Sequence, residues 1–462
     1  MADMTFTGDA FVDLGGLVIN TLPHKTIEDK IRFATDVYVD QWKGKLHSIF
    51  LNSKITHISA KSSVQKRQNS LKYYYGLLNN DGAAINEGYC RVCARPGYLF
   101  EAGRDTYPLT GSGEFVNFHH FHDGGLLVCK ECLIKIYFIP LGILACGEKL
   151  MALQVQDKYT FKFWQEEVIQ RNLDKIHVGS SDGILKSNLS NPQNGLFHIA
   201  SKMISRFDDE PSLPVRLYYF SNFGSSPDVA IYDLPNSIYV FLKRVLKTDL
   251  ENDWKYLVKR HFRLKKAHFD EERQEWLETR KNEEIKLDIQ NYGGWSYNFV
   301  YDYLLSGKSL LGILRKIHKI KPFPIMIAIT YLKEVRRMRQ EQIDLICRIA
   351  DKIIILSQKG NNYNKFLIPL EGARYAGQLR TVILRLVKAH YKNGEAEPFI
   401  RFKEYVEFLF PDGQNWMEVR DFLLISLFER LHDLRIEADL IADEGIPDID
   451  ETVDYVIDRF NA

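Results

Sequence analysis

The sequence predicts an α+β protein with several domains, in which a mixed N-terminal region is followed by an all-helical C-terminal bundle. The length of 462 residues leaves room for about three domains. Residues 215–221 and 229–233 have the composition of a β pair around the turn residues Phe223-Gly-Ser-Ser-Pro. From Gly293 onward, the apolar residues recur at helical spacing. We therefore expect an N-terminal domain over 1–150, a mixed middle domain over 151–322 and a helical bundle over 323–462.

The first predicted element is a short helix that follows Asp13, whose side chain can cap it. Gly15 and Gly16 allow another part of the backbone to approach closely. The segment lacks the G-x-x-x-x-G-K-[ST] order of a phosphate-binding loop, so we assign it no nucleotide-binding role.

Hydrophobic periodicity and capping residues predict further helices along the chain. A solvated helix or arm is expected over Lys265–Gln290, where acids and bases alternate among few apolar residues. The other predicted helices are Ile27 to Leu51 after a Thr26/Asp29 capping box, Ala152–Asn172, a helix within 187–205, Pro235 to Phe262, Ile325–Leu356, Leu379–His390, and a last helix after an Asn415/Glu418 capping box.

Four of the six cysteines form two C-x-x-C pairs, Cys90-Arg-Val-Cys93 and Cys129-Lys-Glu-Cys132. Each pair places two thiolates on one tight turn, and two such turns can complete a tetrahedral site. Four soft thiolates without an open position suit a structural zinc ion best. The alternatives are a redox-active C-x-x-C motif or two chance pairs. We therefore predict a zinc knuckle over residues 90–132, within the N-terminal domain.

The formal net charge of +1 hides an uneven distribution of charge. Nine Lys/Arg face two Asp/Glu over 43–95, nine face three over 243–266, and nine face one over 308–339. Residues 395–462 carry eighteen acids and six bases. Such basic zones can hold phosphates, although most charge runs are solvated helix faces.

The first basic zone contains the candidate phosphate contacts to nucleic acid, and the candidate base contact, Asn117, lies beyond it. Its segment from Ser53 to Tyr75 is rich in Ser, Gln, Asn and bases, and its tyrosines offer faces for base stacking. A mobile surface loop leading into a helix would have a similar composition. Asn117 can donate to and accept from the edge of a base, so it is a candidate groove reader. The candidate phosphate-binding residues are Lys54, Lys61, Lys66, Arg67, Lys72, Arg91 and Arg95.

Three histidines and an aspartate lie between the two cysteine pairs, at His119, His120, His122 and Asp123. Such a cluster raises the possibility of a metal-dependent nuclease. The sequence lacks a second spaced histidine pair upstream and paired carboxylates at helical intervals. We therefore favour a structural or binding loop beside the cysteines and predict no catalytic residues.

The sequence also bears on the compartment. No uninterrupted apolar run reaches the roughly 18 residues that a membrane helix needs. The start, MADMTFTGDAF, lacks the basic and apolar regions of a signal peptide. Thiols arranged for metal, with Cys146 and Cys347 unpaired, fit a reducing cytoplasm and no membrane partner.

Three features together resemble a known family. They are the opening Thr7-Gly8-Asp9, Phe11-Val12-Asp13 and Gly15-Gly16, the two cysteine pairs, and the helical C-terminus. The chain resembles the large subunit of the type I-B CRISPR Cascade surveillance complex, in the Cst variety of the Cas-eight-b group. The likeness covers most of the length, and the cysteine pairs are its most specific part.

The resemblance implies a non-catalytic subunit with guide RNA, target double-stranded DNA and other Cascade subunits as partners. Such a subunit binds the RNA 5′ end and the motif flanking the target, stabilises the R-loop and docks a helicase-nuclease or a transposition adaptor. A zinc-stabilised regulatory or transposition protein that binds DNA without RNA is a further alternative.

The resemblance also raises an internal translation start. Met326 and Met338 precede the last helices, and translation from Met338 would give a product of residues 338–462. The alternative is that both methionines pack in the core.

Overall fold

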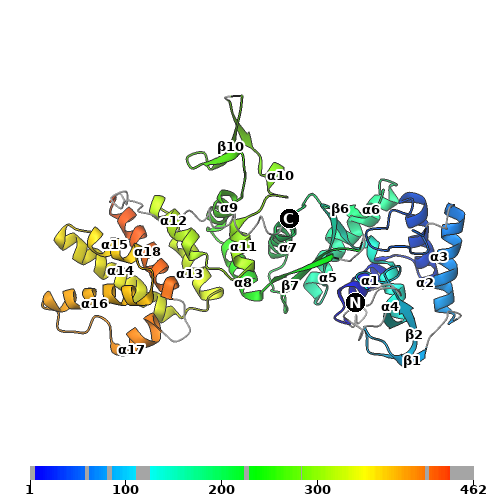
Figure 1. Ribbon diagram of the computed structural model, residues 1–462, viewed down its shortest axis with the longest axis horizontal. Helices are drawn as coiled ribbons and strands as arrows, with labels where there is room; N and C mark the ends of the chain where they lie inside the picture. The colour runs from blue at the N-terminus through cyan, green and yellow to red at the C-terminus, as the bar shows by residue number, and fades with distance from the viewer. Residues whose placement is uncertain are drawn as a thin grey trace. The chain divides into compact units, whose positions relative to one another are not determined.

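The computed structural model describes residues 6–57, 62–80, 86–110, 125–222, 228–281, 283–410 and 416–436 (Figure 1). It separates into two compact units, an N-terminal unit, Met1–Gly307, and a C-terminal unit, Lys308–Ala462. The predicted α+β class is confirmed, since helices and three small sheets occur in the N-terminal unit and only helices in the described part of the C-terminal unit. The predicted domain borders near 150 and 322 are not tested by this division and stay predictions.

The helices of the N-terminal unit are mostly short. They are α1 (Ala10–Thr21), α2 (Ile27–Asp36), α3 (Ser63–Leu78), α4 (Lys130–Tyr137), α5 (Lys158–Trp164), α6 (Arg171–His177), α7 (Pro192–Arg206), α8 (Asn236–Leu246), α9 (Glu251–Arg260), α10 (Ile289–Tyr292) and α11 (Phe299–Leu305). Shorter helical turns are η1 (Val37–Gln41), η2 (Ile139–Leu141) and η3 (Gln165–Gln170).

Three separate sheets accompany these helices (Figure 1). The first has the order β1-β2-β3, the second β6-β4-β5-β7-β8, and the third β11-β10-β9. Their strands are β1 (Asn86–Tyr89), β2 (Pro96–Ala102), β3 (Leu126–Cys129), β4 (Leu144–Cys146), β5 (Lys149–Leu153), β6 (Leu185–Lys186), β7 (Val215–Ser221), β8 (Asp228–Leu234), β9 (Ala267–Asp270), β10 (Glu275–Arg280) and β11 (Glu283–Leu287). The predicted β pair is confirmed, because β7 and β8 are antiparallel with Val215 opposite Leu234.

Helix α1 begins at Ala10, four residues earlier than the start after Asp13 that the sequence predicted. Asp9, not Asp13, caps the helix, because its side chain accepts hydrogen bonds from the backbone N–H groups of Phe11 and Val12. The carboxylate of Asp13 lies inside the first turns and reaches back to accept from the backbone N–H of Thr7 at 2.8 Å and of Gly8 at 3.0 Å. The two carboxylates therefore fix the helix start from both sides.

The two glycines of α1 have different surroundings. A Cβ atom on Gly15 would lie 1.9 Å from the carbonyl oxygen of Lys135 at the end of α4. A Cβ atom on Gly16 would meet only the Lys135 side chain, at 3.5 Å or more. Gly15 therefore permits the close crossing of α1 over α4. The close backbone approach predicted for both glycines occurs at Gly15 and not at Gly16.

The predicted helix from Ile27 to Leu51 is wrong beyond Gln41. Helix α2 continues directly into η1, which ends at Gln41. Lys43 and Gly44 then have φ values of 52° and 76°, which turn the chain. Trp42, Leu46 and Ile49 are nevertheless fully buried. Burial in an irregular turn thus reproduced the spacing expected of a helix.

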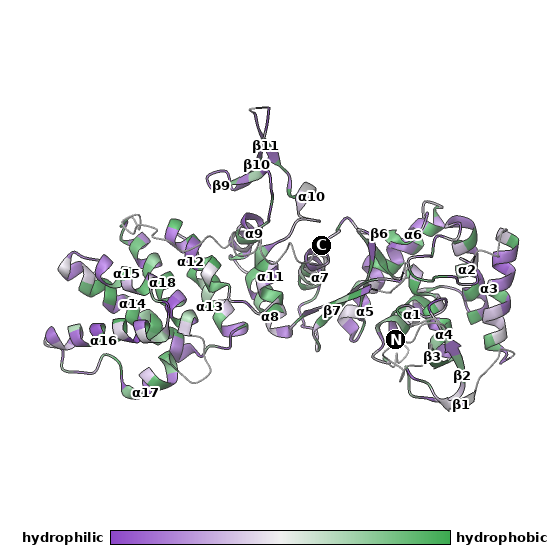
Figure 2. Ribbon diagram, in the orientation of Figure 1, coloured by the Kyte–Doolittle hydropathy of each residue, from purple (hydrophilic) through white to green (hydrophobic). Residues whose placement is uncertain are grey.

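Three further helix predictions in the N-terminal unit need correction. Ala152 lies in β5, and helix α5 begins only after Asp157, which caps it together with Thr160. The helix expected from Pro235 to Phe262 is two helices, α8 and α9. The segment expected as a helix or arm over 265–290 forms the sheet β9–β11, whose strands show mainly hydrophilic colours in Figure 2.

The C-terminal unit is the predicted helical bundle. Its helices are α12 (Leu311–Ile320), α13 (Ile325–Glu334), α14 (Gln340–Gly360), α15 (Asn364–Glu371), α16 (Ala376–Lys392), α17 (Phe402–Glu404) with η4 (Tyr405–Leu409), and α18 (Trp416–Asp433). The single helix expected over Ile325–Leu356 is broken between α13 and α14, where Arg337 has a φ of 55°. Asn415, the predicted cap of α18, lies outside the described residues.

Helix α18 is the centre of this bundle, and it packs against α12, α13, α14, α15 and α16. It carries two buried acids, each of which has a cation from an earlier element. Arg315 of α12 pairs with Asp421 at 3.0 Å, and Arg336 pairs with Glu418 at 2.5 Å. The Glu418 side chain is only 4% exposed. A buried carboxylate needs such a partner, because leaving it alone is costly.

We predict opposite effects for alanine at the two glycines of α1. Gly15→Ala should lower the free energy of unfolding of the N-terminal unit by about 3 kcal/mol, because its Cβ overlaps the backbone of Lys135. Gly16→Ala should leave it unchanged or raise it by about 0.5 kcal/mol, because alanine favours the helix. Denaturant unfolding of both variants measures this difference. Equal stabilities would show that α1 does not need this close crossing.

Candidate metal centre

The four cysteines come from two places in the fold, the turn between β1 and β2 and the junction of β3 with α4. Cys90 directly follows β1, and Cys93 lies in the tight turn that leads to β2. Cys129 ends β3, and Cys132 lies in the first turn of α4. The first turn is closed by two hydrogen bonds, from Ala94 N–H to the Cys90 carbonyl and from Cys90 N–H to the Arg95 carbonyl, both at 2.9 Å.

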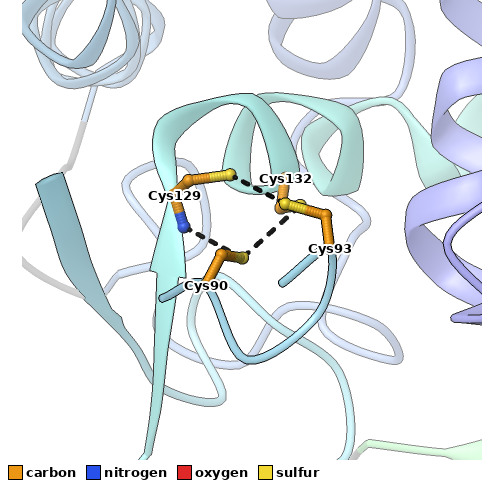
Figure 3. Close-up of side chains that lie close together, drawn as sticks. All are labelled: Cys90, Cys93, Cys129 and Cys132. Carbon is orange, nitrogen blue, oxygen red and sulfur yellow. Dashed lines mark hydrogen bonds between the residues drawn. The ribbon is translucent and has the colours of Figure 1, made fainter. Parts of the chain in front are cut away.

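All four sulfur atoms lie within 4.8 Å of one another (Figure 3). The Sγ atoms of Cys90 and Cys132 are 3.8 Å apart, and those of Cys93 and Cys129 are 3.6 Å apart. Four sulfurs bound tetrahedrally at about 2.3 Å from one zinc ion would be roughly 3.8 Å from each other. A disulfide would require about 2.05 Å. The cluster therefore fits a single tetrahedral metal ion.

The site is closed. Cys90 and Cys132 are 2% exposed and Cys129 is 7% exposed, so only Cys93 has substantial access to solvent. The backbone N–H of Cys129 donates to the Cys90 sulfur at 3.3 Å. Hydrogen bonds with Cys129 and Cys132 lower the pKa of the Cys90 thiol far below its ordinary value. Such a site can hold a structural ion but offers no coordination position to a substrate.

The two other cysteines take no part. Cys146 is fully buried elsewhere, and burial raises the pKa of its thiol to about 11. Cys347 lies in the C-terminal unit. Within the described residues, the four-cysteine cluster is the one group of three or more His, Cys, Asp or Glu side chains close enough to share an ion.

The candidate phosphate-binding residues near α3 have varied environments. Arg67 forms ion pairs with Asp36 and Asp40, so its charge is already compensated within the fold. Lys54 lies over the ring of Tyr73 at 5.1 Å, and Lys66 is half-buried. Lys72 is exposed. Of these residues, Lys72 is the most available to a ligand.

The tyrosines of α3 are mainly structural. Tyr74 is 5% exposed and lies 3.9 Å, between ring centroids, from Tyr137 of α4. Tyr75 donates a hydrogen bond to the carbonyl of Glu28. Arg91 and Arg95 are exposed on the turn that carries Cys93. The metal centre thus displays two bases, whereas α3 packs its tyrosines against the protein.

Several predicted residues lie outside the described part of the chain. They are Lys61, Asn117, His119, His120, His122 and Asp123. The segment before them is anchored at Asn222, which is fully buried. Its side-chain oxygen accepts from Leu109 N–H at 3.2 Å, and its amide nitrogen donates to the carbonyls of Ile49 and Arg104. The structural role of Asn222 could not be predicted from a local sequence pattern, because its hydrogen-bond partners are distant along the chain.

A basic surface on α16 was missed by the sequence analysis. We call it the α16 face, and define it by Arg380, Arg385, Lys388 and Lys392, all exposed. Helix α16 contains no acidic residue. Within the described residues none of these four side chains forms an ion pair, although Arg380 lies over the ring of Phe410 at 4.8 Å. The absence of acids over seventeen residues was visible in the sequence and could have indicated this face.

No family model, curated protein or solved structure matches this chain. Among the described helices, none combines the length and apolar content needed to cross a bilayer.

We predict that the protein binds one zinc ion per chain and that Cys90→Ser removes it. Chelation or Cys90→Ser should also abolish the cooperative unfolding of the N-terminal unit, because structural zinc sites contribute about 10–16 kcal/mol of apparent binding free energy. Metal analysis and calorimetry of the purified protein measure both effects.

Cys347→Ser is the matched control, since it removes a thiol outside the cluster. It should keep the full zinc content. Equal zinc in both variants would contradict a cysteine-held site, and loss of zinc without a change in unfolding would contradict a structural role.

Proposed function

We propose that this protein is the non-catalytic large subunit of an RNA-guided DNA-targeting complex. In this role it binds the guide RNA 5′ end and the motif flanking the target, stabilises the opened duplex, and docks an effector, either a helicase-nuclease or a transposition adaptor. The RNA-guided part rests on the resemblance of the N-terminal signature, the cysteine pairs and the helical C-terminus. The α16 face is the observation that supports nucleic-acid binding.

The α16 face has the properties expected of a phosphate-binding surface. Arg385, Lys388 and Lys392 lie three or four residues apart, so they share one side of the helix. At 1.5 Å rise per residue, they extend over roughly 10 Å of its length. Because no acid within the described residues compensates them, an approaching phosphate backbone would meet their full charge and release its counterions.

The closed cysteine site supports a role without catalysis. Zinc held by four thiolates has no open position for water or substrate, so it cannot act as a Lewis acid. It would instead fix the turn that displays Arg91 and Arg95. This arrangement suits a protein that positions nucleic acid for a partner to cut or modify.

Purification from the native operon with a tag on this chain tests the proposal. We expect several co-purifying subunits and a short RNA of uniform length, visible on a gel after extraction. In such a complex, the guide RNA recognises the target sequence by base pairing, and the protein contacts the flanking DNA and the nucleic-acid backbone. Each complex therefore needs one guide, so the RNA should be stoichiometric with the protein.

A single protein without RNA would contradict the proposal. In that case, DNA cutting that requires Mg²⁺ or Mn²⁺ would favour a nuclease built on the cluster from His119 to Asp123. Sequence-specific binding of duplex DNA without RNA would favour a regulatory or transposition protein.

We also predict that neutralising the α16 face weakens nucleic-acid binding regardless of sequence. Arg385→Gln with Lys388→Gln should reduce affinity for single-stranded DNA about tenfold and lower the slope of log affinity against log salt by roughly 1.4, or 0.7 per lost contact. Fluorescence anisotropy at several salt concentrations measures both quantities.

The control is Lys359→Gln with Lys365→Gln, which removes the same charge from exposed positions outside α16. It should change the affinity less than threefold. Equal losses in the two double variants would show that only net charge matters and that the α16 face has no special role.

A further inference from the structure

A cavity of about 720 Å³ lies in the N-terminal unit, away from the cysteine cluster. Its walls come from α7, the end of α8, α9, α10, α11 and the turn between β9 and β10. The cavity lies within the size range of ligand sites, roughly 300–1,000 Å³. Part of its lining comes from residues 243–266, the second basic zone of the sequence.

Part of the cavity lining is apolar and aromatic. Ile204, Leu246, Val258 and Ile289 contribute aliphatic side chains, and Tyr301 contributes a ring. That ring stacks on Phe197 with a centroid distance of 4.0 Å and an interplanar angle of 6°, so its position is fixed. A planar, mainly apolar group such as a nucleobase fits a wall of this kind.

The same cavity is lined by four bases, Lys247, Lys255, Lys259 and Arg273, and among its described lining residues by one acid, Glu251. Three of the bases have acidic partners. Lys247 pairs with Asp208 at 2.7 Å, and Lys255 pairs with Glu251 at 2.7 Å. Arg273 pairs with Asp270 at 3.7 Å and with Glu284 at 3.4 Å.

Lys259 differs from the other three. Its side chain is half-buried and has no acidic partner within the described residues. Its backbone is held in place, because its carbonyl accepts a hydrogen bond from the Trp276 indole at 2.7 Å. Because no acid in the described residues already pairs with it, the Lys259 ammonium can form a charge-assisted hydrogen bond with an anion in the cavity.

We propose that this cavity binds one nucleotide unit of a nucleic-acid strand, with the base against the apolar wall and a phosphate at Lys259. Lys255 and Arg273 would assist from the rim. The inference deepens the proposed function, on which it rests, by naming where a strand is held in the N-terminal unit. An acidic peptide would satisfy Lys259 but would leave the apolar wall without a planar partner.

Anisotropy of fluorescein-labelled dT10 with the full chain tests the proposal, with Lys259→Gln compared against Lys265→Gln. Lys265 is exposed, lies six residues further along and does not line the cavity, so its variant loses the same charge. Lys259→Gln should weaken binding at least fivefold, and Lys265→Gln less than twofold. Added AMP shows whether the cavity needs a strand or only a nucleotide. Displacement of dT10 by millimolar AMP indicates that a free nucleotide suffices, and no displacement indicates that a strand is required.

Equal, small effects of the two variants on a protein that does bind dT10 would overturn the cavity site and leave the proposed function intact. Failure of the parent protein to bind either dT10 or AMP would overturn the cavity site. Loss of co-purifying RNA in the native complex is a separate result, and it alone would count against the proposed function. Competition by polyglutamate as strong as by unlabelled dT10, and lost in Lys259→Gln, would assign the cavity to acidic peptides and overturn the nucleotide proposal.

Discussion

The contact between Gly15 and the carbonyl of Lys135 is the constraint on which the N-terminal unit depends. It sets the distance between α1 and α4. Helix α4 in turn connects the cysteine cluster with helices α2 and α3. Its first turn supplies Cys132 to the metal centre. Its last residue, Tyr137, lies between α2 and α3, where its hydroxyl forms hydrogen bonds with Thr35 at 2.8 Å and Ser70 at 2.9 Å. A change at the crossing would therefore reach the cysteines and the helices together.

The metal centre and the charged surfaces have separate tasks in this arrangement. The cysteines join two places in the fold that are 36 to 42 residues apart, which limits the freedom of the chain between them. The binding surfaces that we propose lie elsewhere, on the α16 face and in the cavity beside α9. This separation is typical of proteins whose metal maintains a shape while basic side chains make the contacts.

The sequence allowed parts of this structure to be predicted and not others, for physical reasons. Cysteine spacing is a local property, so the cluster could be identified from two motifs alone. The breaks in the chain at Lys43 and Arg337, just after a helical segment ends, could not be predicted, because nothing local predicts a positive φ at a non-glycine residue. The charged sheet β9–β11 was mistaken for a helix or arm because its acids and bases pair across strands, as Lys286 does with Glu275. The pairing of Arg67 with acids of another helix likewise depends on tertiary structure.

The ion pairs of α18 constrain any shorter product of the same reading frame. Met338 is 3% exposed, whereas Met326 is 49% exposed. A polypeptide that began at Met338 would lack Arg336 and leave Glu418 buried without its cation, at a cost of about 3–5 kcal/mol. One that began at Met326 would retain Arg336 and most of α13. Like the shorter product, it would lose α12 and Arg315, the cation of α12 that pairs with Asp421. If a separate small subunit is made from this gene, the bundle is better able to fold from the earlier methionine.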